Sequence, residues 1–545
     1  MRNMYVRFSA LAVCAIAGVA HAAVFTWNPA ESGSGPSDGS GTWMTGTGGW
    51  WDGTANVAWT SGNQAVFGAG TDGTYSVDVG GAVTTTNGNA TTGGLNFEND
   101  GYTLSAASAQ SVFLGNNASG SVNSFVRVAP GKTATIGPNV TVRRNGGAGG
   151  QLGVVGGGTL EVATGGTLLN TYSNLNEVAN GTTLRVNGGT ATFRSSLVVG
   201  QFTAGSGLGG AIVLDDGAVT LETGNMIIGR TAGDVSSVSL NDGSLTVTAG
   251  AVRTDNGAGT LTLNGGTLTA TQIYRAGGTL NVILNGGTLR AAGTSATDFL
   301  AASLSSVTVD GGGVTIDSNG RSITANASLA AGAGNGGLAK IGTGTLTLAG
   351  ANTYTGPTNV DGGTLLVNGG LGATTVSVAA GGTLGGTGTI AGPTTILAGG
   401  TIAPGVSPGT LTISGSPLVI DDAATLAFEI NAADTTVGGG INDLINGIAD
   451  LTLGGTLNLA GSGDFTSVVP GTTWRLMDYT GLLTDNTLTI GTAPTLAAGL
   501  AFAVDVTTAN QVNLSVVPEP VAMSAVVLGL AVAGRLVRRR VFGRR

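Results

Sequence analysis

The sequence Leu263-Asn264-Gly265-Gly266-Thr267-Leu268 recurs unchanged at Leu284-Asn285-Gly286-Gly287-Thr288-Leu289. Asn-Gly favours turns with positive φ, and the residues that follow alternate between polar and apolar side chains. Each copy therefore predicts a turn followed by a short strand with one buried and one solvated face. The body of the chain lacks a helical period of 3.6 residues, so we expect strands there.

Related copies of this unit fill the middle of the chain. Each has a β-branched residue or Leu, then Asn or Asp, then glycine, and the copies begin at Val186, Leu214, Leu240, Leu263, Leu284, Val309 and Val360. Because a unit of about 25 residues with three short strands is too small to bury a core alone, it must stack on its neighbours. The pattern predicts a parallel β-helix of about 13 coils between residues 105 and 415, on the order of 60 Å long.

The Asn or Asp at the start of these copies would form a ladder along one corner of the stacked coils. One interpretation of the ladder is a calcium-binding ridge. The alternative, which we favour, is turn chemistry combined with hydrogen bonds between side chains. The glycine-rich nonapeptide of calcium-binding β-rolls does not occur in the sequence. We therefore predict neither a metal site nor a cofactor.

The first 22 residues predict export. Arg2 and Arg7 precede an apolar run at residues 8–20, and Ala20-His21-Ala22 has the small-x-small pattern of a signal-peptide cleavage site, with Ala20 and Ala22 as its small residues. Residues 1–22 are therefore expected to be a secretory signal peptide that is removed after Ala22.

The last 29 residues combine three features in order. Val517-Pro518-Glu519-Pro520 is followed by the apolar run 521–534 and then by an arginine cluster that includes Arg538, Arg539 and Arg540. The run is shorter than the roughly 20 apolar residues that normally span a bilayer, and arginines favour the cytoplasmic side. In this order the features resemble a PEP-CTERM sorting signal; an ordinary tail anchor is the alternative.

This resemblance implies a sorting route. It implies transient insertion of residues 521–537 in the inner membrane as a short hydrophobic helix, followed by processing by an exosortase-like enzyme. We therefore expect an exported protein at the cell surface or in the extracellular matrix, with a C-terminal membrane segment before processing.

The composition of the mature chain excludes several kinds of chemistry. The chain's one cysteine, Cys14, and its one histidine, His21, both lie in the signal peptide. This excludes disulfides, thiolate or imidazole zinc sites, and Ser-His-Asp or Cys-His catalysis from the mature chain. Residues 23–517 carry 13 basic and 29 acidic residues, a net charge of −16. Such an acidic body argues against nucleic acid as a partner.

Two stretches near the end of the repeat region resemble a known family. The sequence of residues 336–348, continued at 352–358 and 362–365, closely resembles the autotransporter-associated β-strand repeat. Residues 381–390 and 403–411 resemble the end of autotransporter passenger domains. The resemblance implies a right-handed β-helical passenger displayed on a cell surface. Only about 100 residues separate residue 415 from the sorting tail, which is too few for a translocator barrel, so we expect a passenger-like stalk with a different anchor.

The two ends of the predicted rod differ from its middle. Residues 23–105 contain five of the six tryptophans and are expected to form a β cap that protects the first open edge. The alternative is a glycan-binding platform formed by exposed indole rings of Trp43, Trp50, Trp51 and Trp59. The predicted order of domains is the cap, the β-helix at 106–415 with the resembling repeat near 336–368, a terminal β region at 416–516, and the sorting segment at 517–545.

We expect a structural or adhesin-like surface protein without catalytic residues, with extracellular polysaccharide as a possible partner. Two other hypotheses stay open. One is a β-helical polysaccharide-degrading enzyme, which would require at least three acidic residues converging beside a groove. The other is a glycan-binding module that uses the N-terminal tryptophans.

Overall fold

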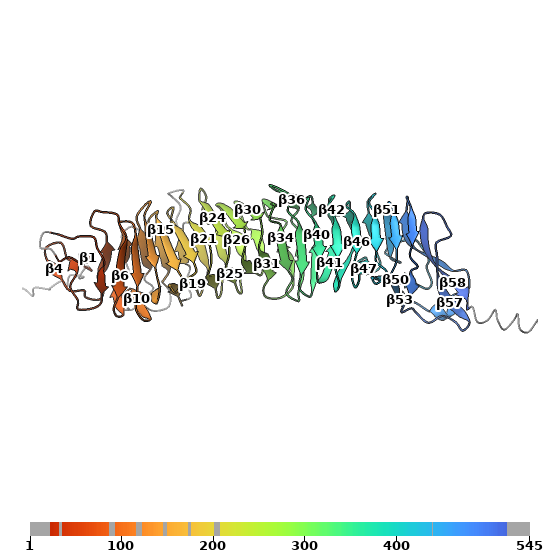
Figure 1. Ribbon diagram of the computed structural model, residues 1–545, viewed down its shortest axis with the longest axis horizontal. Coiled ribbons are helices and arrows are strands. Elements are labelled where there is room, and N and C mark those ends of the chain that lie inside the picture. Colours follow the sequence, from red (N-terminus) through yellow and green to blue (C-terminus); the bar gives the residue numbers. More distant parts are fainter. Residues whose placement is uncertain are drawn as a thin grey trace, which may run out of the picture.

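The computed structural model shows an elongated all-β rod with the N-terminal strands at one end and the C-terminal strands at the other (Figure 1). The described residues are 22–31, 35–86, 93–115, 123–144, 150–172, 176–200, 208–438 and 440–519. Their one helical element is a 3₁₀ turn, η1 (Phe465–Ser467), and they contain no helix long and apolar enough to cross a membrane. The predicted C-terminal helix, and the predicted signal peptide except Ala22, lie outside these residues.

Each coil of the rod contributes one short strand to each of three faces. Strands of successive coils pair in parallel, as the repeat predicted: β27 with β30, β28 with β31 and β29 with β32. The bounds of these strands are β27 (Ala258–Leu263), β28 (Thr267–Ala270), β29 (Ile273–Arg275), β30 (Thr279–Leu284), β31 (Thr288–Ala291) and β32 (Ala296–Leu300). The predicted parallel β-helix is confirmed.

The stack extends beyond residues 106–415 on both sides. The first face is a sheet of 17 strands from β7 (Val83–Thr85) to β55 (Leu483–Asp485), which spans roughly 80 Å at about 4.8 Å per strand. The second face is a sheet of 21 strands that runs from β1 (Val24–Trp27) to β56 (Thr489–Ile490). The rod is therefore longer than the 60 Å expected from the repeat region.

The third face is built from two sheets in succession. The first has 12 strands, from β2 (Gly41–Trp43) to β36 (Leu329–Ala331). The second has eight strands and begins at β39 (Ala351–Asn352). It ends with an antiparallel pair, β57 (Leu500–Asp505) and β58 (Gln511–Pro518).

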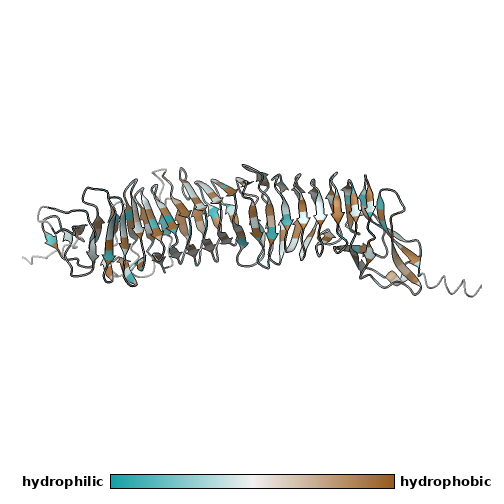
Figure 2. Ribbon diagram, in the orientation of Figure 1, coloured by the Kyte–Doolittle hydropathy of each residue, from teal (hydrophilic) through white to brown (hydrophobic). Residues whose placement is uncertain are grey.

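The core is a set of side-chain rows that run along the inside of the rod. Residues on strands such as β27 and β28 alternate between inside and outside, and Figure 2 shows apolar residues recurring in the strands along the whole rod. One inward row of the first face is Val112, Val142, Leu168, Ala191, Val219, Leu245, Leu268, Leu289, Ile316, Lys340 and Val360.

Lys340 is the charged member of this apolar row and is 0% exposed. It lies on β37 (Leu338–Ile341) between Ile316 and Val360 of the neighbouring coils. Its Nζ donates hydrogen bonds to the carbonyl oxygens of Ile341 at 2.8 Å, Gly342 at 2.9 Å and Gly362 at 3.1 Å. The ammonium thus joins the turns of two successive coils from inside the rod.

The predicted corner ladder is present. Asn241 Nδ2 donates to Asp215 Oδ1 at 2.7 Å, and Asn264 Nδ2 donates to Asn241 Oδ1 at 2.9 Å. Asn285 Nδ2 then donates to Asn264 Oδ1 at 3.1 Å. Four successive coils are therefore linked by side-chain hydrogen bonds, which confirms the interpretation that we favour.

Aromatic clusters close both ends of the rod. Near the N-terminus, β1 pairs antiparallel with β3 (Trp50–Trp51), and the buried rings of Trp50 and Trp59 lie 4.7 Å apart between centroids. At the other end, β58 pairs antiparallel with β54 (Thr473–Tyr479). Trp474 on β54 packs between Phe465 and Phe502, and its Nε1 donates to the carbonyl oxygen of Asn431 at 2.8 Å. These antiparallel strands and rings cover the open edges of the parallel stack.

Candidate functional site

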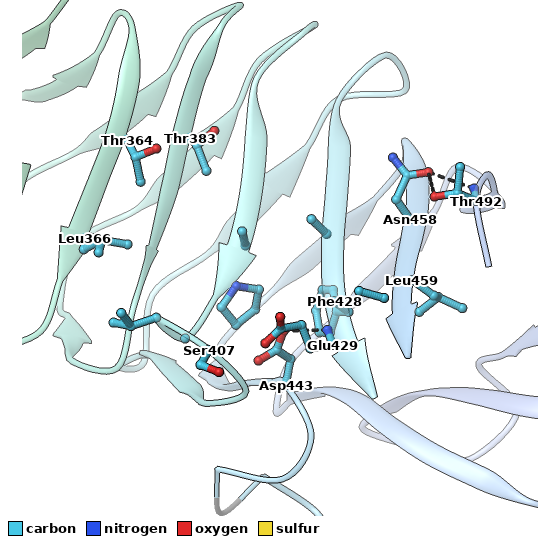
Figure 3. Close-up of a pocket in the computed structure, with 16 residues that line it drawn as sticks. Thr364, Leu366, Thr383, Ser407, Phe428, Glu429, Asp443, Asn458, Leu459 and Thr492 are labelled. Atoms are coloured by element: carbon cyan, nitrogen blue, oxygen red, sulfur yellow. Dashed lines mark hydrogen bonds between the residues drawn. The ribbon is translucent and has the colours of Figure 1, made fainter. Parts of the chain in front are cut away.

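A groove of about 470 Å³ lies on the outer side of the second face, toward the C-terminal end (Figure 3). It crosses five successive strands of that face: β41 (Gly363–Val367), β44 (Gly382–Gly386), β47 (Thr401–Pro404), β50 (Thr425–Asn431) and β53 (Thr456–Ser462). Residues after these strands, in the loops near 405–407, 443 and 492, complete its walls.

Small residues make the floor of the groove hollow. Leu366 on β41 pairs with Gly385, and Gly385 pairs with Ala403 on the next strand. Further along the face, Ala427 pairs with Asn458. Because Gly385, Ala403 and Ala427 lack long side chains, the surface is depressed between the larger Leu366 and Asn458. Threonine side chains, Thr364 and Thr383, line one side of the depression.

A tight loop after β47 forms the opposite wall. Gly405 has a φ of 86° and exchanges two backbone hydrogen bonds with Gly386, at 2.9 and 3.0 Å. A Cβ at position 405 would lie 2.0 Å from the carbonyl oxygen of Ser407, so glycine is required there. The loop carries Val406, which is 63% exposed at the rim of the groove.

Asp443 fastens this loop to the strand beside it. Its Oδ1 accepts a hydrogen bond from the backbone N–H of Gly409 at 2.8 Å, and its Oδ2 accepts one from the backbone N–H of Glu429 at 2.7 Å. The residue is 1% exposed. Burial raises the pKa of Asp443 to about 7, with the charge of Glu429 adding to the rise and the two backbone donors opposing it.

Glu429 is the second carboxylate of the groove. It lies on β50, is half-buried, and stands beside Asp443 in Figure 3. The residues that line the groove include no lysine, arginine or histidine, and no ion pair is formed by Glu429 or Asp443 within the described part of the chain. The groove is therefore acidic without an internal counter-charge.

This arrangement is suited to binding more than to catalysis. Both oxygens of Asp443 are engaged by backbone donors, so its carboxylate is held for structure and is not free to transfer a proton to a ligand. Two acidic residues meet here, fewer than the three that the enzymatic hypothesis required. Over the described ranges, no group of three or more Asp, Glu, His or Cys side chains is placed to hold a metal ion.

The tryptophans singled out from the sequence lie in the cap. Trp43, Trp50 and Trp59 are 0% exposed, so their rings are not available to stack on a sugar. Their Nε1 atoms have no hydrogen-bond acceptor in the described structure and are surrounded by tilted and edge-to-face rings. Trp51 is half-buried, and for this residue glycan binding stays a prediction.

The described part of the chain ends within the predicted sorting motif, at residue 519. Val517 and Pro518 end β58, and the backbone N–H of Glu519 donates to the carbonyl oxygen of Gly499 at 2.8 Å. At the predicted signal cleavage site, Ala22 is exposed. The remaining predicted residues lie outside the described part of the chain: Ala20, Pro520, Arg538, Arg539 and Arg540.

The groove has no signature in the sequence that would identify it as a whole. Strand alternation over residues 425–431 places Glu429 outside the rod, which was a usable signal. Asp443, however, follows a loop of a dozen residues, and no local pattern shows that this loop returns to Glu429. The Ala and Gly residues of the floor look like ordinary repeat residues when they are read one coil at a time.

Comparison with known proteins places the chain near autotransporter passengers. Residues 338–367 match the model of the passenger-associated-transport-repeat family. These residues run from β37 to β41 and include Lys340. The adhesin BmaC autotransporter of Brucella suis biovar 1 (strain 1330) is 44% identical over 116 residues, which are 21% of this chain and 3% of that protein. The chain therefore contains autotransporter-passenger-like repeats and matches a small part of this relative.

Proposed function

We propose that this chain is an exported, surface-retained, adhesin-like protein. The observation that carries the proposal is the match at residues 338–367, which form part of a capped β-helix and not an isolated repeat. The similarity to part of an autotransporter adhesin supports the same role. In this role the rod holds binding surfaces at a distance from the envelope.

The route to the surface is the second part of the proposal. The N-terminal signal peptide directs export, and the tail from Val517 is recognised by an exosortase-like enzyme while residues 521–537 are in the inner membrane. The order of the motif, the apolar run and the arginines supports this route. Extracellular polysaccharide is the proposed environment of the mature rod.

Localisation in the producing cells tests the route. Intact cells are labelled with an antibody against the rod, for the wild-type chain and for the triple variant Arg538→Ala, Arg539→Ala, Arg540→Ala. We expect surface labelling of the wild type and accumulation of an unprocessed, inner-membrane form of the variant. Equal surface labelling of both chains would contradict sorting through the tail, and wild-type protein confined to the cytoplasm would contradict export.

Co-sedimentation of the mature protein with the cells' own extracellular polysaccharide tests its role. New reducing ends and unsaturated sugars are measured in the same tube. Binding without cleavage is the expected result. Cleavage would contradict the structural role and establish the polysaccharide-degrading alternative.

A further inference from the structure

We propose that the groove beside Glu429 and Asp443 binds a basic peptide, an extended segment whose lysine or arginine side chain contacts the carboxylate of Glu429 next to the buried Asp443. The inference rests on the proposed adhesin-like function and deepens it by naming the chemical class of the partner.

The charges of the groove point to a cationic ligand. Glu429 and Asp443 are carboxyl groups placed side by side, one of them buried, and the lining residues supply no cation. A guanidinium or ammonium group between the loop at 404–409 and β50 would favour the ionised form of both carboxyl groups and form charge-assisted hydrogen bonds with Glu429. Because both oxygens of Asp443 already accept backbone hydrogen bonds, Glu429 provides the direct contact and Asp443 adds to the local negative potential.

The shape of the groove favours a peptide over a glycan. From β41 to β53 the groove spans about 20 Å, the length of roughly six extended residues. Its floor is made of small side chains, while Thr364, Thr383 and Asn458 offer hydrogen-bonding groups along it. The one aromatic residue in the lining, Phe428, is buried in the core and offers no ring face for a sugar. Exposed Val406 supplies an apolar contact at the rim.

Fluorescence anisotropy with the mature full-length rod tests the proposal. The probe is the labelled hexapeptide Ala-Ala-Lys-Ala-Ala-Ala, compared with the same peptide carrying acetyl-lysine. Glu429→Gln removes the direct contact, and Ala427→Leu fills the floor from the solvent side without changing charge. Glu222→Gln is the matched control, because Glu222 is an exposed glutamate elsewhere on the rod.

We expect the lysine peptide to bind at least tenfold more weakly to both groove variants and with unchanged affinity to Glu222→Gln. Replacing the lysine of the peptide by acetyl-lysine should weaken its binding to the wild-type chain by a similar factor. Equal weakening by Glu429→Gln and Glu222→Gln would overturn the proposal, since it would indicate general attraction to an acidic chain.

A glucosamine oligomer is assayed in parallel to separate the two classes of ligand. If this oligomer bound in a Glu429-dependent manner while the peptide did not, the peptide assignment would be overturned in favour of an amino-glycan. If neither ligand bound, the groove site would be rejected. The surface role would stand, because the localisation of the chain tests it separately.

Discussion

The buried lysine of the matched repeat gives the sharpest prediction. Burial lowers the pKa of Lys340 from 10.5 to about 8, against the opposing effect of Asp317. Below pH 8 Lys340 is protonated in both states, and its charge is buried in the folded chain but solvated in the unfolded chain. Between pH 8 and 10.5 the folded chain has released this proton while the unfolded chain still binds it, so the free energy of unfolding rises with pH in this window.

The size of the effect follows from the two pKa values. Their difference corresponds to roughly 3 kcal/mol in the free energy of unfolding. Lys340→Met keeps an unbranched apolar side chain in the row between Ile316 and Val360 and removes the titrating group. Relative to this variant, the wild type should therefore gain up to about 3 kcal/mol between pH 8 and 10.5.

Two measurements check this prediction. Guanidinium unfolding followed by far-ultraviolet circular dichroism, at pH values from 7 to 10.5, gives the difference between wild type and Lys340→Met. Lysine-selective ¹³C NMR gives the pKa directly, because the chain has two lysines and Lys132→Arg assigns the signals. Parallel stability curves, together with a Lys340 signal that does not titrate below pH 10, would refute the reasoning. They would mean that the three carbonyl contacts keep the ammonium charged.

Three further predictions address the cap, the ladder and the groove wall. Trp50→Ala should lower the free energy of unfolding by about 3–5 kcal/mol, because it empties a fully buried site. Trp51→Ala, which changes the half-buried neighbour, should lower it clearly less. Equal losses of the two variants in denaturant unfolding would contradict the cap. Asn264→Ala removes both side-chain hydrogen bonds of one ladder residue and should lower the free energy of unfolding by about 1–2 kcal/mol in the same assay. An unchanged denaturant midpoint would show that the ladder adds no stability. Asp443→Ala should speed hydrogen exchange of the Gly409 and Glu429 amides at least tenfold. The control is the Gly388 amide, which donates a hydrogen bond to the carbonyl oxygen of Val367. Unchanged exchange of the Gly409 and Glu429 amides would refute the role of Asp443 in anchoring the loop.

Much of the fold could be predicted because its signals are local and repeated. Asn-Gly turns and period-two strands define each coil, and stacking follows because one coil cannot bury its own core. The extent of the stack could not be predicted, since strands beyond residue 415 such as β52 (Leu451–Leu453) lack the turn signature and take their register from β49 (Leu418–Ile420) and β55 on either side.

The remaining features depend on contacts between coils. Composition alone does not separate a buried indole from an exposed one, so it could not show that Trp43, Trp50 and Trp59 are buried in the cap. Strand alternation places Lys340 inside with Leu338, but nothing near it in the sequence indicates that Gly362, on the next coil, supplies a carbonyl. The groove likewise needs Glu429 and Asp443 to meet across a loop.

The separation of closed ends from a repeating middle has an evolutionary consequence. Each coil contacts its immediate neighbours, so gain or loss of one whole unit by recombination between similar repeats would leave both ends intact. Each such event would change the reach of the molecule by about 5 Å. Related genes could therefore differ in repeat number and still encode stable molecules, with reach adjusted in fixed steps to the thickness of the surface layer that each must cross.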